Sequence, residues 1–445
     1  MDKKLDKILE LVDEYIKDKK ENKVWKAGVD WVKYSGPEFD SKEYMAAIES
    51  LLSEWLIVGK NTQTFEQRFA QIMQKKFGVL TNSGSSANLL MVSALKSNRL
   101  KLVKDGDKFI TPIVAFPTTI NPLLQNNLVP VFVDVELPSL NLDLDQVEAK
   151  LKEDPSIKGI IFAHVLGNPP DMDRLMAIIK QYDLIFLEDA CDALGSSYRQ
   201  QSLGSFGYMS TMSFFPAHHM TIGEGGFVAT DNYNANRALY SLRDWGRACW
   251  CNQISPGDVT AGTACGNRFQ KWFDDVDIIY DHRYVFDEVG YNLKPLDLQA
   301  AMGLKQIDKL KHFENKRKYR WQYLNSVFLD YQQYFHMPKA TKHAKVNWFA
   351  YLLTIKDDAP FTKYEFIKYL EANKIQTRSY FSGNILYHDA YKSLRKNYKD
   401  LQKEFPIAHK VTKDSFFLGC APVITPDQLR YMEKVIRKFM GNFNE

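Results

Sequence analysis

The most constraining feature of the sequence is a regular alternation of short apolar runs and helical patterns between residues 79 and 190. The apolar runs read VLTNS, KFITP, VPVFVD, GIIFAHV and LIFLEDA, and apolar residues at helical spacing separate each run from the next. Strands that alternate with helices form parallel βαβ units, in which the helices cover the faces of one sheet. The sequence therefore predicts an α/β fold built on a mostly parallel sheet.

Patterns outside this region indicate further parts of the chain. Three helical patterns precede the alternation, and smaller strand and helix patterns follow residue 296. We predict an N-terminal helical arm over residues 1–56, a large domain over 57–295 and a smaller C-terminal α/β domain over 296–445. Residues 244–290 combine cysteines, glycines and aromatic residues without a regular period, which is typical of a functional insertion.

The composition excludes several classes of function. The 445 residues include 58 lysines and arginines against 54 aspartates and glutamates, and the basic residues are scattered, so we expect no nucleic-acid partner. No apolar stretch reaches the roughly 20 residues that span a membrane, and the charged N-terminus lacks the apolar core of a signal peptide. We therefore expect a cytoplasmic protein without a membrane partner. Its five cysteines, an odd number, argue against a disulfide framework.

The segment TNSGSSAN at residues 81–88 is a candidate anion site. It joins a predicted strand to a predicted helix, and its small residues Gly84, Ser85 and Ser86 let the backbone approach a ligand. The first N–H groups of a helix and its positive dipole end attract phosphate groups. The pattern therefore indicates a phosphate cradle, and ordinary N-capping by serine is the alternative explanation.

Two further segments carry titratable residues. Glu188 and Asp189 end the run LIFLEDA, at the edge where parallel sheets bind ligands. Such an aspartate can keep a coenzyme's pyridine nitrogen protonated, and a helix cap is the alternative. The loop SFFPAHHMTIGEGG contains His218 and His219, and histidine is the usual general base near neutral pH. Adjacent histidines in structural or surface positions are the alternative here.

Taken together and in this order, the three segments resemble the aspartate-aminotransferase-fold sugar enzymes of the DegT/DnrJ/EryC family. The resemblance runs from about residue 30 to the C-terminus and includes FPTTINPLLQNNLVPVFVDVE, EDACDALGSSY and GYNLKPLDLQAAMGL. It implies the fold of type I pyridoxal-phosphate enzymes, with a large domain and a smaller C-terminal domain. It also implies a nucleotide-linked keto sugar as substrate.

The resemblance implies roles for individual residues. Phe116 would stack on the coenzyme ring, Asp189 would contact its nitrogen, and Asp192 would lie near its hydroxyl group. The expected coenzyme-binding residues are Gly84, Ser85, Ser86, Phe116, Asp189, Asp192, Ser213 and Asn292. Asn292 would come from a neighbouring subunit, which implies a homodimer. Arg378 is a candidate for binding the nucleotide sugar, and an exposed arginine without a ligand is the alternative.

His218 is the position at which the sequence departs from the family. The family loop reads SF-x-P-x-K, and its lysine binds the coenzyme covalently, whereas this chain has His218 there. Histidine cannot form that bond, but it can move a proton. The resemblance therefore implies pyridoxamine 5'-phosphate held noncovalently, with His218 as the base in the loss of the 3-hydroxyl from a 4-keto sugar. An aminotransferase, which would need the lysine, is an alternative.

The cysteines distinguish two branches of the family that use this histidine. One branch, of the colitose-pathway type, has no cluster. The other acts on CDP-4-keto-6-deoxyglucose in 3,6-dideoxyhexose biosynthesis, holds a 2Fe–2S cluster and receives electrons from an NADH-dependent flavin iron–sulfur reductase.

The resemblance to the second branch predicts the pattern C-x57-C-x-C, which this chain has at Cys191, Cys249 and Cys251. Cys265 follows after 13 residues as the expected fourth ligand, and Cys420 is expected in the core. We expect an iron–sulfur dehydrase of a CDP-linked sugar. The alternatives are a cluster-free dehydratase, a sugar aminotransferase, and a noncatalytic protein that uses the same fold.

Overall fold

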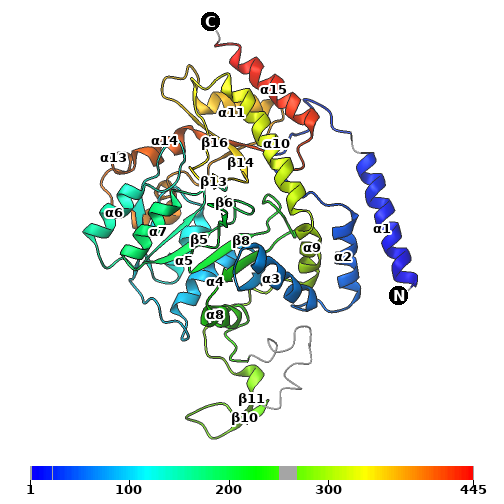
Figure 1. Ribbon diagram of the computed structural model, residues 1–445, viewed down its shortest axis with the longest axis vertical. Helices are drawn as coiled ribbons and strands as arrows, with labels where there is room; N and C mark the ends of the chain where they lie inside the picture. The colour runs from blue at the N-terminus through cyan, green and yellow to red at the C-terminus, as the bar shows by residue number, and fades with distance from the viewer. Residues whose placement is uncertain (1–2, 23, 250–267, 444–445) are drawn as a thin grey trace.

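A seven-stranded sheet forms the centre of the computed structural model, which describes residues 3–22, 24–249 and 268–443 (Figure 1). Its strands are β1 (Phe77–Thr81), β2 (Lys108–Pro112), β3 (Val129–Val133), β4 (Gly159–Ala163), β5 (Ile185–Asp189), β8 (Met209–Ser213) and β9 (Gly226–Thr230). They follow the order β1-β9-β8-β5-β4-β2-β3. Neighbours from β8 to β3 are parallel, and β9 runs antiparallel to both β1 and β8. The prediction of a mostly parallel α/β sheet is confirmed.

Helices cover both faces of this sheet. One face carries α3 (Lys60–Ile72), α6 (Leu144–Glu153) and α7 (Met172–Gln181), and the other carries α4 (Gly84–Lys96), α5 (Pro117–Gln125) and α8 (Tyr233–Arg243). Successive strand residues point to opposite faces. Leu80 and Ile110 therefore pack with the first set of helices, and Val79 and Phe109 pack with the second. Both faces are buried, which explains why the strands read as continuous apolar runs.

Short polar residues set the beginnings of several helices. Ser83, Asp143 and Asp171 have extended backbones, and their side chains accept hydrogen bonds from the first N–H groups of α4, α6 and α7. Such caps satisfy donors that have no partner inside the helix. The junction from strand to helix is therefore encoded locally, and it brings the N-terminus of α4 to the edge of the sheet.

A second, antiparallel sheet lies in the C-terminal part of the chain, at the top of Figure 1. Its strands are β12 (Phe335–His336), β14 (Ala350–Ile355), β15 (Thr377–Ser379) and β16 (Ser415–Gly419), in the order β12-β14-β16-β15. The helices of this region are α10 (Leu310–Leu329), α11 (Lys363–Ala372), α12 (Lys392–Arg395), α13 (Leu401–Glu404), α14 (Pro406–Asp414) and α15 (Pro426–Met440). Phe328, Tyr351, Phe366 and Phe416 belong to its separate core.

The N-terminal helices α1 (Lys3–Glu21) and α2 (Ser41–Leu52) lie at one side of the molecule (Figure 1). Helix α2 packs against α9 (Asp297–Ile307), and α1 packs against α2. Glu43 of α2 is buried and accepts hydrogen bonds from Gln306 at 2.6 Å and Lys309 at 2.5 Å. These contacts join the N-terminal segment to the region that follows the predicted boundary at residue 296. The three-part division of the chain stays a prediction.

The region of the predicted insertion contains a short hairpin. Strands β10 (Phe269–Lys271) and β11 (Ile279–Asp281) pair antiparallel and project below α8 in Figure 1. A 3-10 turn, η2 (His282–Tyr284), follows them. A small third sheet elsewhere joins β6 (Ser197–Tyr198), β7 (Gln201–Ser202) and β13 (Ala344–Lys345). The strands of both features have at most three residues, too few to produce a recognisable sequence period.

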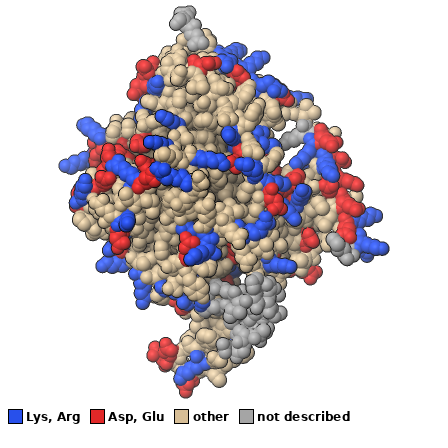
Figure 2. Space-filling model, viewed as in Figure 1, with Lys and Arg blue, Asp and Glu red and all other residues tan. Residues whose placement is uncertain are grey.

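Two surface properties bear on possible partners. Within the described ranges, every helix is too short or too polar to cross a membrane. Figure 2 shows basic and acidic side chains interspersed over the visible face, so that this face has no extended basic patch.

Candidate functional site

The candidate site lies where the carboxyl ends of β5 and β8 meet the N-terminus of α4. Asp189 is the last residue of β5, Ser213 is the last residue of β8, and Gly84 is the first residue of α4. The loop that leaves β8 carries His218. Three of the segments singled out in the sequence therefore meet at one edge of the sheet, where α/β proteins bind ligands.

Asp189 is buried and held by three hydrogen-bond donors. Its Oδ2 atom accepts from Asn88 Nδ2 at 2.8 Å and from Thr119 Oγ1 at 2.7 Å, and its Oδ1 atom accepts from the Cys191 backbone N–H at 3.2 Å. Thr211 Oγ1 in turn donates to Asn88 Oδ1 at 2.6 Å. Oδ1 keeps one lone pair that could accept a hydrogen bond from the N–H group of a protonated pyridine ring.

Sequence reasoning included Asn88 only as the end of the segment at residues 81–88 and missed that Asn88 and Thr119 hold the carboxylate of Asp189. Asn88 lies one turn of α4 after Gly84, and Thr119 lies in the first turn of α5. Asn88 directly precedes the apolar run LLMV, and a polar residue next to positions that enter the core was a usable signal, because buried amides need partners. The neighbouring sequence did not indicate which carboxylate Asn88 would bind.

Glu188, the neighbour of Asp189, points to the other face of the sheet. Its side chain is fully buried, and it accepts hydrogen bonds from the backbone N–H groups of Gly204 at 2.9 Å and Gly207 at 2.6 Å. His164 Nε2 lies 3.0 Å from Glu188 Oε2. Glu188 therefore holds the loop that contains Gly204 and Gly207, whereas Asp189 faces the candidate site.

The segment at residues 83–86 forms a tight cradle with Ser213. A Cβ atom on Gly84 would lie 2.5 Å from Ser213 Cβ, and one on Gly226 would lie 2.1 Å from the Ser83 carbonyl oxygen. Ser83 Oγ accepts from the Ser86 backbone N–H at 3.1 Å, so Ser83 caps the helix. Ser85 is exposed. Glycine is needed at both positions for the backbones to approach, and the approach brings the Ser213 hydroxyl beside the start of α4.

His218 pairs with Asp192 across the site. Its Nδ1 atom lies 3.3 Å from Asp192 Oδ1, and only 16% of the His218 side chain and 9% of the Asp192 side chain are exposed. The two atoms are close but not hydrogen-bonded, since His218 Nδ1 has no hydrogen-bond partner. The Phe349 ring lies 5.4 Å from the imidazole. A carboxylate beside one imidazole nitrogen favours a proton there and leaves the other nitrogen as a base.

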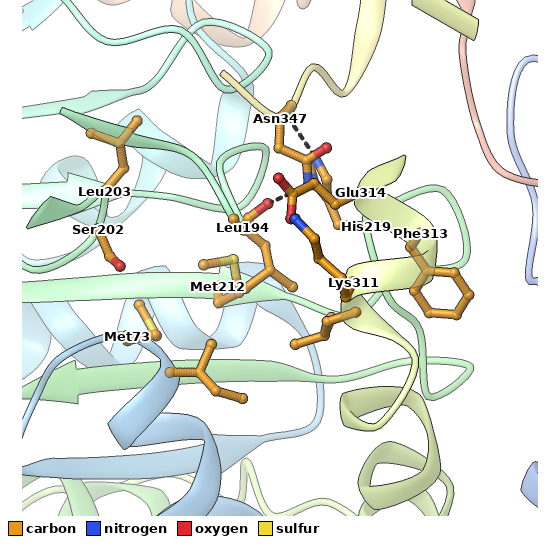
Figure 3. A pocket seen from close by; sticks show the side chains of 13 residues that line it. Met73, Leu194, Ser202, Leu203, Met212, His219, Lys311, Phe313, Glu314 and Asn347 are labelled. Atoms are coloured by element: carbon orange, nitrogen blue, oxygen red, sulfur yellow. Dashed lines mark hydrogen bonds and ion pairs between the residues drawn. The ribbon is translucent and has the colours of Figure 1, made fainter. Parts of the chain in front are cut away.

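His219 faces away from this site. Its Nε2 atom lies 2.8 Å from the Asn347 carbonyl oxygen, which can only accept a hydrogen bond. Burial, and next the positive charge of Arg317, hold the pKa of His219 well below its usual value. Figure 3 shows His219 and Asn347 side by side at a cavity of about 250 Å³ that Leu194 and Met212 also line. His219 is therefore a neutral structural residue, so of the two histidines only His218 faces Asp192.

Three further predicted residues lie on exposed parts of the chain. Phe116 is 49% exposed, and its ring centre lies 6.2 Å from that of Phe381. Asn292 is exposed and forms an isolated bridge with Asp244. Arg378 is exposed, and its guanidinium lies 4.3 Å from the centre of the Tyr34 ring. The contacts described for these three residues thus reach Phe381, Asp244 and Tyr34, and their roles in the site stay predictions.

Two of the four expected cluster ligands lie in the described residues. Cys191 and Cys249 are free, whereas Cys251 and Cys265 fall outside the described ranges. Burial, and next the charge of Asp189, raise the pKa of the Cys191 thiol well above its usual value. Along the described chain, Cys191 and Cys249 included, no group of three or more histidine, cysteine or acidic residues could hold a metal ion. Cys420 is buried, as expected, and its Sγ atom lies 3.3 Å from the Trp348 carbonyl oxygen.

The sequence as a whole identifies the family. Residues 37–437 match the DegT/DnrJ/EryC1/StrS aminotransferase family. The chain belongs to this family. This result confirms the resemblance at the level of the family and agrees with the arrangement of Asp189, Ser213 and the loop of His218 at the sheet edge.

Named relatives match over almost the whole chain. The dTDP-4-dehydro-2,6-dideoxy-D-glucose 3-dehydratase of Saccharopolyspora spinosa is 40% identical over 438 residues, which cover 98% of this chain and 92% of that protein. The lipopolysaccharide biosynthesis protein RfbH of Salmonella typhimurium is 36% identical over 438 residues, which cover 98% of both chains. Among solved structures, the Escherichia coli GDP-4-keto-6-deoxy-D-mannose-3-dehydratase with bound hydrated PLP superposes with a TM-score of 0.77 at 28% identity, covering 91% of this chain and 99% of that one.

Proposed function

We propose that the protein removes the 3-hydroxyl group of a nucleotide-linked 4-keto-6-deoxyhexose, with pyridoxamine 5'-phosphate as coenzyme. The observation that carries the proposal is a histidine, His218, at the position of the family's lysine, with Asp192 3.3 Å away. A histidine there supports proton transfer and not covalent storage of the coenzyme. Two of the relatives described above are named 3-dehydratases of nucleotide-linked keto sugars, which supports this reaction.

The residues at the sheet edge fit such a coenzyme. The close contact of Gly84 with Ser213 leaves backbone N–H groups and a hydroxyl for a phosphate group. Asp189 Oδ1 has acceptor capacity for the ring nitrogen, because Asn88 and Thr119 both donate to the other oxygen. We assign the phosphate to Gly84, Ser85, Ser86 and Ser213, and the ring nitrogen to Asp189. Phe116, with its half-exposed ring, is assigned to the ring face.

When bound, the coenzyme would supply an amine that joins the keto group of the sugar and a conjugated ring through which the electrons of a broken C–H bond reach carbon 3, where the C–O bond breaks and the hydroxyl group leaves. His218 would take up the proton that the coenzyme methylene releases. We assign Nε2 of His218 as the acceptor, because Asp192 next to Nδ1 favours a proton on that nitrogen. Asp189 stabilises the positive charge of the protonated ring nitrogen, which is what makes the ring an electron acceptor.

The finer part of the proposal concerns electrons and partners. We propose that Cys191, Cys249, Cys251 and Cys265 hold a 2Fe–2S cluster, since four thiolates are the usual ligand set. Cluster binding would deprotonate the Cys191 thiol, whose pKa burial otherwise raises. An NADH-dependent flavin iron–sulfur reductase would supply the electrons, and the sugar would be CDP-linked. A homodimer would complete each site with Asn292 of the partner subunit, and Arg378 would bind the nucleotide part.

Protein purified without oxygen tests both parts of the proposal. It is loaded with pyridoxamine phosphate and incubated in deuterated water with the CDP-, dTDP- or GDP-linked 4-keto-6-deoxy sugar. We expect deuterium in the coenzyme methylene and loss of the 3-hydroxyl with one of the three. Absence of exchange with all three would contradict the dehydration.

Iron and sulfide analysis of the same sample tests the cluster. We expect two irons and two sulfides per chain, lost in Cys251→Ser and kept in the matched control Cys420→Ser, because Cys420 lies in the core. Full turnover in a sample without iron, with glutamate regenerating the coenzyme, would favour the cluster-free dehydratase instead.

A further inference from the structure

The loop that carries His218 lacks regular secondary structure. After Ser213 at the end of β8, the chain forms no helix or strand until Gly226 begins β9. No ladder or helix therefore fixes the main chain at His218. A general base must lie within hydrogen-bond reach of the proton that it removes, so its position must be fixed by other contacts.

The side chain of Arg317 supplies such contacts. Arg317 lies on α10 and is 1% exposed, one of the largest fully buried side chains of the protein. Its Nη2 atom donates to the His218 carbonyl oxygen at 3.0 Å and lies 3.5 Å from the Ala217 carbonyl oxygen. Its Nη1 atom donates to the Phe349 carbonyl oxygen at 2.8 Å. One guanidinium thus joins the loop of the base to the residue that precedes β14.

Arg317 is unusual because its charge is buried without an ion pair. Its hydrogen-bond partners among the described residues are the carbonyl oxygens of residues 217, 218 and 349 and the Cys420 side chain, with no carboxylate among them. A buried cation without an ion pair is costly, and main-chain carbonyl dipoles together with the Cys420 side chain compensate it here. The contacts that compensate the charge of Arg317 are therefore the same ones that join the loop of His218 to Phe349.

Two other contacts hold the same loop but reach different atoms. Ser35 Oγ donates to the Ala217 carbonyl oxygen at 2.7 Å, and His219 Nε2 lies 2.8 Å from the Asn347 carbonyl oxygen. Among the described residues, only Arg317 forms a hydrogen bond with the main chain of His218 from another element. We propose that Arg317 is a positioning residue that fixes His218 for proton transfer by binding its carbonyl oxygen. This inference rests on the proposed role of His218 as the base.

Arg320 provides a matched control on the same helix. It is also buried, and it also binds main-chain carbonyls, namely those of Ile424 at 2.6 Å, Pro422 at 2.8 Å and Lys316 at 2.9 Å. None of them belongs to the loop of His218. Arg320→Met should therefore cost a similar amount of thermal stability as Arg317→Met but leave the base in place.

The first measurement is amide hydrogen exchange in the protein without coenzyme. Two loop amides are internal reporters, since His218 N–H donates to the Phe215 carbonyl at 3.0 Å and Ile222 N–H donates to the Phe214 carbonyl at 3.2 Å. We expect the peptide over residues 214–222 to exchange at least tenfold faster in Arg317→Met and within twofold of wild type in Arg320→Met. Unchanged protection in Arg317→Met would overturn the proposal.

The second measurement is deuterium incorporation into the methylene of bound pyridoxamine phosphate in the presence of the sugar. We expect the rate to fall at least tenfold in Arg317→Met, with KM within twofold, and to recover in part in Arg317→Lys. An equal loss in Arg320→Met would mean a merely structural role and would overturn the proposal. If Arg317→Met does not fold, Arg317→Lys and Arg320→Lys are compared in the same two assays.

The two measurements separate this inference from the proposed function. If wild-type protein exchanges no methylene proton with any of the three sugars, the proposed function fails. In that case the loop protection still decides whether Arg317 fixes the main chain at His218.

Discussion

Replacing Asp189 with asparagine should slow proton transfer at the coenzyme at least a hundredfold while the fold survives. The reason lies in the three donors around the carboxylate. Asn88 and Thr119 donate to Oδ2 at 2.8 and 2.7 Å, and the Cys191 backbone N–H donates to Oδ1 at 3.2 Å. An amide has one oxygen and one NH2 group, so its NH2 must face at least one donor in either orientation.

The preferred orientation follows from the number of bonds kept. With its oxygen toward Asn88 and Thr119, the amide keeps two hydrogen bonds and turns its NH2 toward the coenzyme ring. A buried donor without an acceptor costs about 1–3 kcal/mol, so the reverse orientation is disfavoured. The ring nitrogen then meets a donor instead of a carboxylate and loses its proton. Preorganised electrostatic contacts of this kind contribute about 3 kcal/mol, or more than a hundredfold in rate.

The assay is deuterium incorporation into the coenzyme methylene at saturating coenzyme, with thermal unfolding as a check of the fold. Thr119→Val is the matched control, because it removes one donor and keeps the charge. We expect it to cost about 1 kcal/mol, or roughly fivefold in rate. Exchange in Asp189→Asn within about threefold of wild type, with the coenzyme bound, would refute the reasoning and remove Asp189 from the ring nitrogen.

Three further predictions concern other residues. His218→Lys should bind pyridoxal phosphate through a bond that borohydride makes permanent, detected by mass spectrometry, whereas His219→Lys should not, because His219 faces Asn347. His219→Gln should reduce the loss of stability in acid. Burial lowers the pKa of His219 in the folded protein, so below about pH 6.5 the unfolded chain binds a proton that the folded protein does not. This difference lowers the free energy of unfolding by up to roughly 1.4 kcal/mol per pH unit. Urea unfolding at pH 7.5 and 5.5 measures this difference, and equal losses would contradict it. Arg378→Ala should raise KM for the nucleotide sugar about tenfold and leave kcat within about twofold; steady-state kinetics with the opposite pattern would exclude Arg378 from the substrate site.

The alternation of strands and helices could be predicted because it depends on local periodicity. Runs buried on both faces of a sheet read as continuous apolar segments, and caps such as Ser83 and Asp171 mark the helix starts. The dependence on local periodicity also explains which features of the sheets the sequence did not predict. The strand that reverses direction, β9, has no pattern that reveals its direction, and the hairpin of β10 and β11 is too short to show a period.

The support of the candidate site could not be predicted, because its partners are far apart in the chain. Asn88 and Asp189 are 101 residues apart, and Thr119 and Asp189 are 70 residues apart. Arg317 and the His218 carbonyl are 99 residues apart. A hydrogen bond across such distances depends on how helices pack on the sheet, and no spacing in the sequence encodes it.

The sequence by itself determined which chemical groups the protein brings to the edge of its sheet: a carboxylate at Asp189, small residues at 84–86, and imidazoles at 218 and 219. Residue identity sets that chemistry, since histidine can move a proton but cannot replace lysine in a covalent bond. Only the tertiary structure decided which imidazole faces Asp192 and which is buried against Asn347. The reason is physical: adjacent residues of an irregular loop can point in different directions, and the contacts with α10 and residues 347–349 select one direction for each.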